Sequence, residues 1–168
     1  DCGPMSTPAP TDRTLRDILR RTRSIALVGV SPNPIRPSHY VGRYLWRRGY
    51  RVFPVNPKLE GATLFGEPAV DDLGGLAARG VEVDMLDIFR RSEEAGAVVD
   101  AAIAALSDRG LRTIWMQIGV IDEAAAERAR SRGLEVVMDR CPKMEHQRLF
   151  GELSRAGVNT GIISSRRA

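Results

Sequence analysis

The segment IALVGVSPNPIRPS, residues 25–38, has the layout of a strand, a glycine turn and the start of a helix. Its first four residues are apolar, as in a strand that is buried on both faces. Gly29 has no Cβ, so another group can approach its backbone closely. Ser31 and Ser38 offer hydroxyls, Arg36 can pair with a phosphate, and Ser38 is expected to cap a helix whose first amides attract an anion. The segment predicts a phosphate-binding loop, and a plain strand-to-helix turn is the alternative.

Two features distinguish this loop from an ordinary NAD site. The glycine spacing is not Gly-x-Gly-x-x-Gly, and the second predicted strand ends without the acidic residue that holds ribose hydroxyls. Asn56, Pro57 and Lys58 follow that strand instead. Pro57 offers a flat apolar wall for an adenine ring, or merely stiffens a turn. Lys58 suits a ribose phosphate, which keeps both NADP and coenzyme A open as ligands.

Short apolar runs alternate with amphipathic helical patterns along the chain. Strands are expected at residues 25–30, 51–55, 83–89, 113–116 and 134–138, and helices at 11–23, 38–48, 72–78, 92–109, 122–132 and 143–153. Ser92 is expected to cap the fourth of these helices, and residues 58–72 are less regular. This alternation predicts an α/β fold, with an open, doubly wound, mainly parallel sheet of about five strands and helices on both faces. Ligands of such sheets bind beyond the carboxyl ends of the strands.

Length and composition narrow the class of protein. A chain of 168 residues suits one domain with a proper core. Its net charge of +4 suits a small polyanionic ligand, but no basic block with interleaved aromatics points to nucleic acid. No apolar run approaches the roughly 20 residues of a membrane span. The two cysteines are far apart and favour the cytoplasm over an oxidising compartment.

The chain ends differ in character from its middle. Residues 1–10 are expected to form a flexible N-terminus in which Met5 is the natural start, and residues 154–168 a polar C-terminal tail. The ligand-binding domain is expected to span residues 11–153. A homodimer is compatible with the sequence, although nothing in it requires one.

Candidates for catalysis are few. Cys141 is followed by His146, but a Cys–His pair needs contact in space, and a small buried cysteine is the alternative. Asp139, Arg140 and Glu145 are expected to form an ionic cluster at the carboxyl edge. The histidines and cysteines have no metal-ligand spacing, and no nucleophile elbow or Walker loop is present. The residues therefore lean against an enzyme.

Several motifs, taken in order, resemble a known family. The residues that carry the resemblance are VGVS at 28–31 with Pro34, Arg36, Ser38 and Val41, GYRVFPVNP at 49–57, DIFR at 87–90 with Glu93, WMQIGV at 115–120, and DRC at 139–141 with Glu145, Arg148 and Leu149. They resemble the small stand-alone CoA-binding proteins, whose fold is similar to the CoA-binding domain that begins the succinyl-CoA synthetase alpha subunit. The resemblance covers about residues 15–153.

The resemblance implies that coenzyme A binds in a Rossmann-like cleft. It assigns the phosphates to Gly29, Val30, Ser31, Arg36 and Ser38, and the sides of the nucleotide to Val55, Asn56 and Pro57. It assigns the adenine or pantetheine path to Ile88, Phe89 and Arg90, and the far side of the cleft to Gln117 and Gly119. The synthetase subunit has a glycine-richer loop and a separate phosphohistidine domain, so ligase chemistry is not expected of this chain.

Three functional hypotheses follow. The first is a protein that binds coenzyme A or an acyl-CoA through its nucleotide and phosphates, with no chemistry of its own and the thiol end left to a partner or to solvent. The second is an NADP-dependent oxidoreductase with Asp139 or His146 as its acid. The third is an enzyme that acts on an acyl-CoA with Cys141 as its nucleophile.

Overall fold

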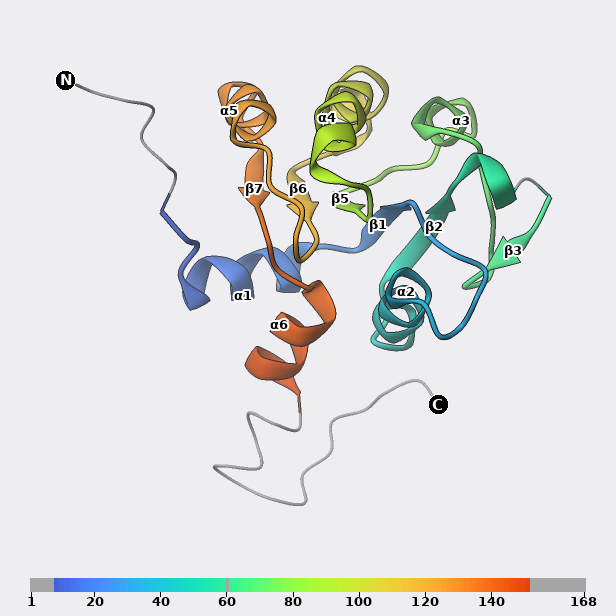
Figure 1. Ribbon diagram of the computed structural model, residues 1–168, viewed down its shortest axis with the longest axis horizontal. Helices are drawn as coiled ribbons and strands as arrows, with labels where there is room; N and C mark the ends of the chain where they lie inside the picture. Colours follow the sequence, from blue (N-terminus) through green and yellow to red (C-terminus); the bar gives the residue numbers. More distant parts are fainter. Residues whose placement is uncertain (1–7, 60, 152–168) are drawn as a thin grey trace.

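The computed structural model describes residues 8–59 and 61–151, and it has a five-stranded parallel sheet at its centre (Figure 1). The strands are β1 (Ser24–Val28), β2 (Arg51–Val55), β5 (Met85–Ile88), β6 (Thr113–Met116) and β7 (Glu135–Val137). Their order in the sheet is β2-β1-β5-β6-β7. The chain thus moves outward from β1 in one direction and later returns to its other side, which makes the β1–β5 boundary a topological switch point. The predicted fold class is confirmed. The expected N-terminal start and C-terminal tail fall largely outside the described residues.

Helices cover both faces of the sheet (Figure 1). One face carries α1 (Asp12–Arg21), α2 (Pro37–Arg47) and α6 (Pro142–Phe150), and the other carries α3 (Leu73–Ala78), α4 (Ser92–Leu106) and α5 (Glu123–Ser131). Short 3-10 turns follow β2 (η1, Pro57–Leu59) and α4 (η2, Ser107–Arg109). None of the helices within residues 8–59 and 61–151 has the length and apolar character needed to cross a membrane.

Two hydrophobic cores lie on the two sides of the sheet. Ala26 and Val28 of β1 belong to the core under α3, α4 and α5. Ile25 and Leu27 alternate with them and belong to the core under α1, α2 and α6, where the fully buried Trp115 is the largest side chain. All five residues of β1 are buried, as expected for a central parallel strand.

The start of α2 differs from the prediction. Arg36 is the N-cap residue, with no capping hydrogen bond from its side chain, and Pro37 occupies the first turn. Proline suits this position because its fixed φ fits a helix and its missing N–H would have no partner there. Ser38 therefore lies inside the helix, where its Oγ accepts a hydrogen bond from the Ser31 N–H at 2.9 Å. The prediction that Ser38 caps the helix was wrong.

A small hairpin occupies the stretch that the sequence pattern left irregular. β3 (Thr63–Leu64) pairs antiparallel with β4 (Glu67–Pro68), and Phe65 at the tip has a φ of +55°. The Phe65 ring packs on α2 at Gly42, where an added Cβ would lie 2.6 Å from the ring. The ring also meets the edge of the His39 imidazole, at 5.4 Å between centroids. His39 Nδ1 lies 2.9 Å from the Ser31 carbonyl oxygen. The hairpin therefore contacts the loop after β1 through the His39 side chain.

Gly29 marks the point where the ends of β1 and β5 meet. Its φ is +90°, and a Cβ added there would lie 2.2 Å from the carbonyl oxygen of Phe89. The Phe89 N–H donates to the Val28 carbonyl at 2.8 Å, which holds the two strand ends together. Glycine is therefore required here by the backbone of β5, and this requirement exists before any ligand is considered.

Asp87 is a buried acid in the middle of the sheet. It pairs in register with Leu27 on one side and with Trp115 on the other, which places it on the α1–α2–α6 side. Its side chain is fully buried, and neither carboxyl oxygen has a hydrogen-bond partner in the described part of the chain. Burial raises the pKa of Asp87 well above its ordinary value, because a charge without a partner is costly there. Burial therefore favours the protonated, neutral form of Asp87 in the folded state.

Replacing Asp87 with Asn is expected to flatten the pH dependence of the free energy of unfolding. The folded state keeps a proton on Asp87 at pH values where the unfolded chain has lost it, so stability falls as pH rises between the ordinary and the raised pKa. The slope removed is about 1.4 kcal/mol per pH unit in that window. Urea unfolding at several pH values measures it. Asp108→Asn, at an exposed aspartate, is the control, and equal slopes for wild type and Asp87→Asn would contradict the expectation.

Replacing Gly29 with Ala is expected to destabilise the fold more than the left-handed backbone alone explains. Gly49 provides the comparison, because its φ is +108° and an added Cβ would meet no atom within 4 Å. Gly49→Ala should cost about 1–2 kcal/mol, the usual cost of a left-handed conformation. Gly29→Ala should cost more, because the methyl group also collides with Phe89. Denaturant unfolding compares the two, and equal losses would show that the collision is relieved.

Candidate ligand-binding site

Two pockets open at the carboxyl edge of the sheet, on either side of Phe89. The loop pocket, of about 470 Å³, lies between the loop after β1 and the end of β2. The turn pocket, also about 470 Å³, lies beyond the ends of β5 and β6. Phe89 lines both pockets. They meet at the switch point, where open α/β sheets bind their ligands.

Most of the predicted site residues line one of these pockets. Those in the loop pocket are Gly29, Val30, Ser31, Arg36, Ser38, Asn56 and Phe89, and those in the turn pocket are Phe89, Arg90, Gln117 and Gly119. Three lie elsewhere: the side chains of Val55 and Ile88 belong to the core under α3, α4 and α5, and Pro57 is exposed at the start of η1. Lys58, on the same turn, does line the loop pocket.

The loop after β1 satisfies most of its own backbone donors. The Ser31 N–H donates to Ser38 Oγ, and the Asn33 N–H donates to Ser31 Oγ. Asn33 in turn accepts two hydrogen bonds. Its side-chain oxygen accepts from the Ile35 N–H, and its backbone carbonyl accepts from the Arg36 N–H. These bonds fix the shape of the loop in advance of any ligand.

Two amides of this loop have no partner, and both residues are buried, with Val30 0% and Ser38 7% exposed. Residues 32, 34 and 37 are prolines and have no N–H. Within residues 29–38, only the N–H groups of Val30 and Ser38 have no hydrogen-bond partner in the described structure. Arg36 and Lys58 line the same pocket and form no ion pair with any described residue. The residues that carry these two donors and two cations all line one pocket, an arrangement that suits a phosphate group.

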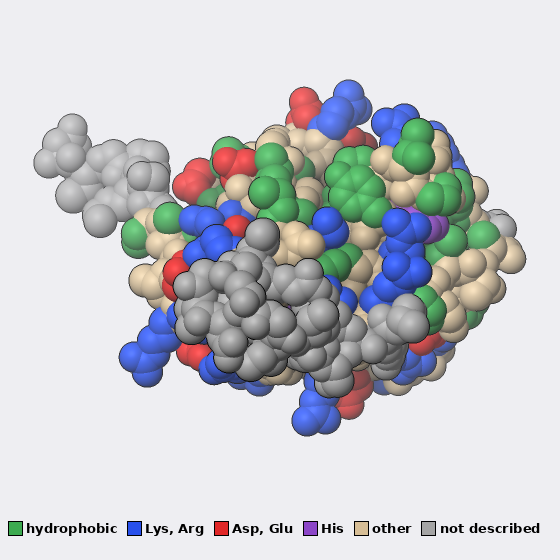
Figure 2. Space-filling view, turned by 90° about the horizontal axis from the view of Figure 1, so that it is seen from below, with side chains coloured by type: hydrophobic (Ala, Val, Ile, Leu, Met, Phe, Trp, Pro, Cys, Tyr) green, Lys and Arg blue, Asp and Glu red, His purple; other side chains and the backbone are tan. Residues whose placement is uncertain are grey.

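The surface over α2 and the chain as a whole carry positive charge. Figure 2 views the molecule from the side of α2 and α6, and Lys and Arg side chains lie beside hydrophobic ones on its right, over α2. The chain as a whole has a net charge of +4. A positive net charge favours the approach of a polyanion.

Asn56 has a structural role that the sequence did not reveal. Its buried Nδ2 donates to the Val30 carbonyl at 2.8 Å, and its Oδ1 accepts from the Lys58 N–H at 3.0 Å. Both ends of the amide are therefore engaged in joining η1 to the loop after β1. This side chain positions Val30 and Lys58 at the loop pocket.

The turn pocket has mixed chemistry. Phe89, Ile118 and Val120 give it apolar walls. Gln117 is only 7% exposed, and its Oε1 has no hydrogen-bond partner in the described chain. Arg90 lines the pocket without an ion pair to any described residue, whereas its neighbour Arg91 pairs with Glu94. A buried acceptor in such a pocket suits a ligand that brings an N–H or O–H group.

The residues considered for catalysis do not assemble into a catalytic group within the described chain. Cys141 is a free thiol, 5% exposed, at the N-cap of α6. No hydrogen bond between Cys141 and His146 is present among the described residues, and His146 Nδ1 instead lies 2.9 Å from the Tyr44 hydroxyl. No cluster of three or more metal-ligating side chains occurs in residues 8–59 and 61–151.

The expected ionic cluster at this edge forms only in part. Arg140 pairs with Glu145 at 3.2 Å, and Glu145 also pairs with Arg148 at 2.7 Å. Asp139 does not join them: its Oδ1 accepts a hydrogen bond from the Gly119 N–H at 2.7 Å. The predicted inclusion of Asp139 in the cluster was wrong, because the backbone amide of the neighbouring loop binds its carboxylate.

Ser92 likewise differs from its predicted role as a helix cap. Arg91 is the N-cap of α4, and the Ser92 hydroxyl instead joins α4 to the loop after β6. Its Oγ donates to the Gly119 carbonyl at 3.2 Å and accepts from the Ile121 N–H at 3.0 Å. Nothing in the local sequence distinguishes this bridge from a cap.

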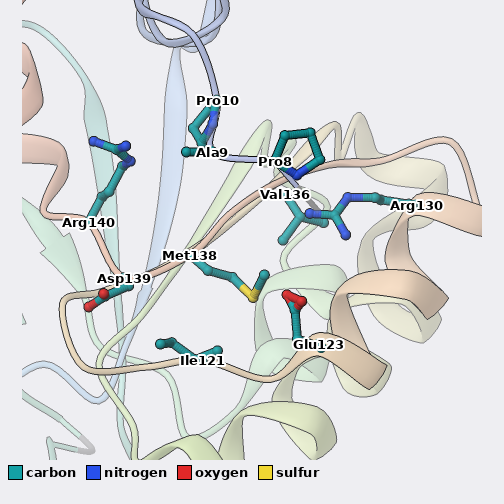
Figure 3. A pocket seen from close by; sticks show the side chains of 10 residues that line it. All are labelled: Pro8, Ala9, Pro10, Ile121, Glu123, Arg130, Val136, Met138, Asp139 and Arg140. Carbon is teal, nitrogen blue, oxygen red and sulfur yellow. The ribbon is translucent and has the colours of Figure 1, made fainter. Parts of the chain in front are cut away.

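A third pocket, of about 290 Å³, lies on the outer side of β7 (Figure 3). Met138 points into it, and Pro8, Glu123 and Arg130 line the end of the pocket that is away from Asp139 (Figure 3). None of the residues predicted to bind coenzyme A lines it, although Asp139 and Arg140 of the expected ionic cluster do. The Asp139 carboxylate lies at its border and is turned away from its centre (Figure 3).

Known proteins share this architecture. A redesigned form of the PH1109 protein is 35% identical, with a TM-score of 0.76 over 86% of this chain and 95% of its own. A Thermus thermophilus protein, cell-free ID.343, is 36% identical, with a TM-score of 0.73 over 84% of this chain and all of its own. The uncharacterized protein YneT of Bacillus subtilis (strain 168) is 32% identical over 137 residues, which cover 82% of this chain and 95% of YneT.

A larger protein contains the same fold. The dinucleotide-forming acetyl-coenzyme A synthetase 1 of Ca. Korarchaeum cryptofilum matches 71% of this chain with 27% of its own, at 22% identity and a TM-score of 0.54. This likeness concerns the fold alone. The family model described as CoA binding domain matches residues 23–147, which include both pockets of the carboxyl edge. The chain therefore belongs to the CoA binding domain family.

Proposed function

We propose that this protein binds coenzyme A or an acyl-CoA at the carboxyl edge of its sheet and performs no chemistry of its own. The observation that carries the proposal is the pair of unengaged amides, of Val30 and Ser38, beside Arg36 and Lys58 in the loop pocket. Membership of the CoA binding domain family supports the choice of ligand. The proposed binding domain spans residues 11–153, and the proposed setting is the cytoplasm.

The loop pocket takes the nucleotide half of the ligand in this proposal. The pyrophosphate lies over the N-terminus of α2, where the Val30 and Ser38 amides donate to it and Arg36 pairs with it. Lys58 is placed to meet the ribose phosphate, and Pro57 to flank the adenine. Because the loop is already held by its own hydrogen bonds, little conformational entropy is lost when the ligand binds.

The turn pocket takes the pantetheine arm. The arm passes Phe89 and brings its amide groups to Gln117, whose Oε1 lacks a partner among the described residues. Phe89, Ile118 and Val120 pack against its methylene groups. The thiol or acyl end then lies toward solvent, where a partner can reach it. Cys141 is buried and has no hydrogen-bonded base in the described chain, which supports binding over catalysis.

Replacing Arg36 with Ala is expected to weaken coenzyme A binding roughly tenfold, the usual magnitude for a charge-assisted hydrogen bond that is partly screened by solvent. Isothermal titration calorimetry measures the effect at two salt concentrations. The wild-type protein should lose affinity as salt rises, and Arg36→Ala should lose less. Arg13→Ala is the matched control, because Arg13 is an exposed residue of α1 and does not line either pocket.

Thermal stability in the presence of candidate ligands separates the hypotheses. Coenzyme A and acyl-CoAs should raise the Tm, because a ligand that binds only the folded state stabilises it. NADP and NAD should leave the Tm unchanged. A rise with NADP and none with coenzyme A would overturn the proposal and favour the oxidoreductase hypothesis.

A further inference from the structure

The loop after β6 stands between the turn pocket and the third pocket. Gln117, Ile118, Gly119 and Val120 line the turn pocket, and Ile121 lines the third. The Val120 N–H donates to the Gln117 carbonyl at 2.8 Å, which closes a four-residue turn. The conformation of this turn therefore fixes where Gln117 and Ile118 meet a ligand.

Two hydrogen-bonding side chains hold the turn from opposite sides. Ser92 binds the Gly119 carbonyl and the Ile121 N–H from the side of α4. Asp139 binds the Gly119 N–H from the side of β7. Figure 3 shows the Asp139 carboxylate directed out of the third pocket, toward the ribbon of this loop. The Gly119 amide is thus engaged by Asp139 and does not face a ligand.

The backbone of Asp139 is itself unusual. Its φ is +58°, and Phe65 is the only other non-glycine residue with a positive φ in the described chain. Aspartate adopts this region more readily than most residues, but the conformation still has a cost. Such a conformation persists where the surrounding structure enforces it, and it is common at functional positions. In Asp139 it coincides with a short, charge-assisted hydrogen bond to the turn.

We infer that Asp139 is a positioning residue for the pantetheine half of the site. Resting on the proposed function, this inference adds that the two halves of the ligand are governed separately. The loop pocket is held by the hydrogen bonds of Ser31, Asn33 and Asn56, none of which involves Asp139. The turn pocket depends on the Asp139–Gly119 bond. Loss of that bond releases one side of the turn, while Ser92 keeps the other.

Two substitutions separate the hydrogen bond from the backbone conformation. Asp139→Gly tolerates the positive φ and removes the acceptor. Asp139→Asn also tolerates the positive φ and keeps an oxygen that accepts from Gly119. Each variant is titrated by calorimetry with coenzyme A and with adenosine 3′,5′-bisphosphate, which carries the adenine and ribose phosphates without the pantetheine arm.

Asp139→Gly should raise the Kd for coenzyme A about tenfold, because the turn then spends most of its time outside the binding conformation. Its Kd for the bisphosphate should stay within about twofold of wild type, and Asp139→Asn should stay within about threefold for both ligands.

Equal losses of both ligands in Asp139→Gly, unchanged coenzyme A binding, or failure of that variant to fold would each overturn the inference. If the wild-type protein binds coenzyme A but Asp139→Gly does not lose coenzyme A selectively over the bisphosphate, only the role of Asp139 is contradicted. A wild-type protein that does not bind coenzyme A overturns the proposed function, and the inference with it.

Discussion

The contact between Gly29 and the backbone of Phe89 is the constraint on which the carboxyl edge depends. A methyl carbon at Gly29 would lie 2.2 Å from the Phe89 carbonyl oxygen, so the two strand ends approach as closely as a glycine permits. This closeness places Phe89 between the loop pocket and the turn pocket, where it lines both. It also fixes the direction in which the chain leaves β1 and enters the loop toward α2. Both halves of the proposed site therefore take their geometry from one backbone contact at the switch point.

The loop after β1 limits the backbone donors that a ligand could meet. Three prolines have no N–H, and the amides of Ser31, Asn33, Ile35 and Arg36 are already engaged within the loop. The anion-attracting groups are thereby limited to Val30, Ser38 and the nearby cations. A glycine-rich dinucleotide loop presents its backbone to a pyrophosphate in a different way. The absence of the second and third glycines is thus explained by a loop whose shape comes from proline and from side-chain hydrogen bonds.

Local patterns predicted the sheet and its helices because these depend on periodicity and on nearby caps. The strands at 51–55 and 113–116 match the prediction at both ends. The helices predicted to begin at Asp72 and Asp122 do begin there, with these two residues as their N-caps. The interactions that shape the site join distant segments and left no local signal. Gly29 was identified as a site residue for its approach to a ligand, whereas its nearest neighbour is Phe89. Phe65 on Gly42, Asn56 on Val30 and Asp139 on Gly119 all connect residues from separate elements.

The backbone amides of the loop pocket give the most direct test of the central claim, that a phosphate of coenzyme A is bound by the N–H groups of Val30 and Ser38. The measurement is a two-dimensional amide NMR titration of the isotopically labelled protein with coenzyme A. Both amide protons should shift downfield on saturation, as they do when they donate to a phosphate, and the Ile35 amide, already bonded to Asn33, should move little. Saturable binding that leaves the amides of Val30 and Ser38 unshifted would contradict the account.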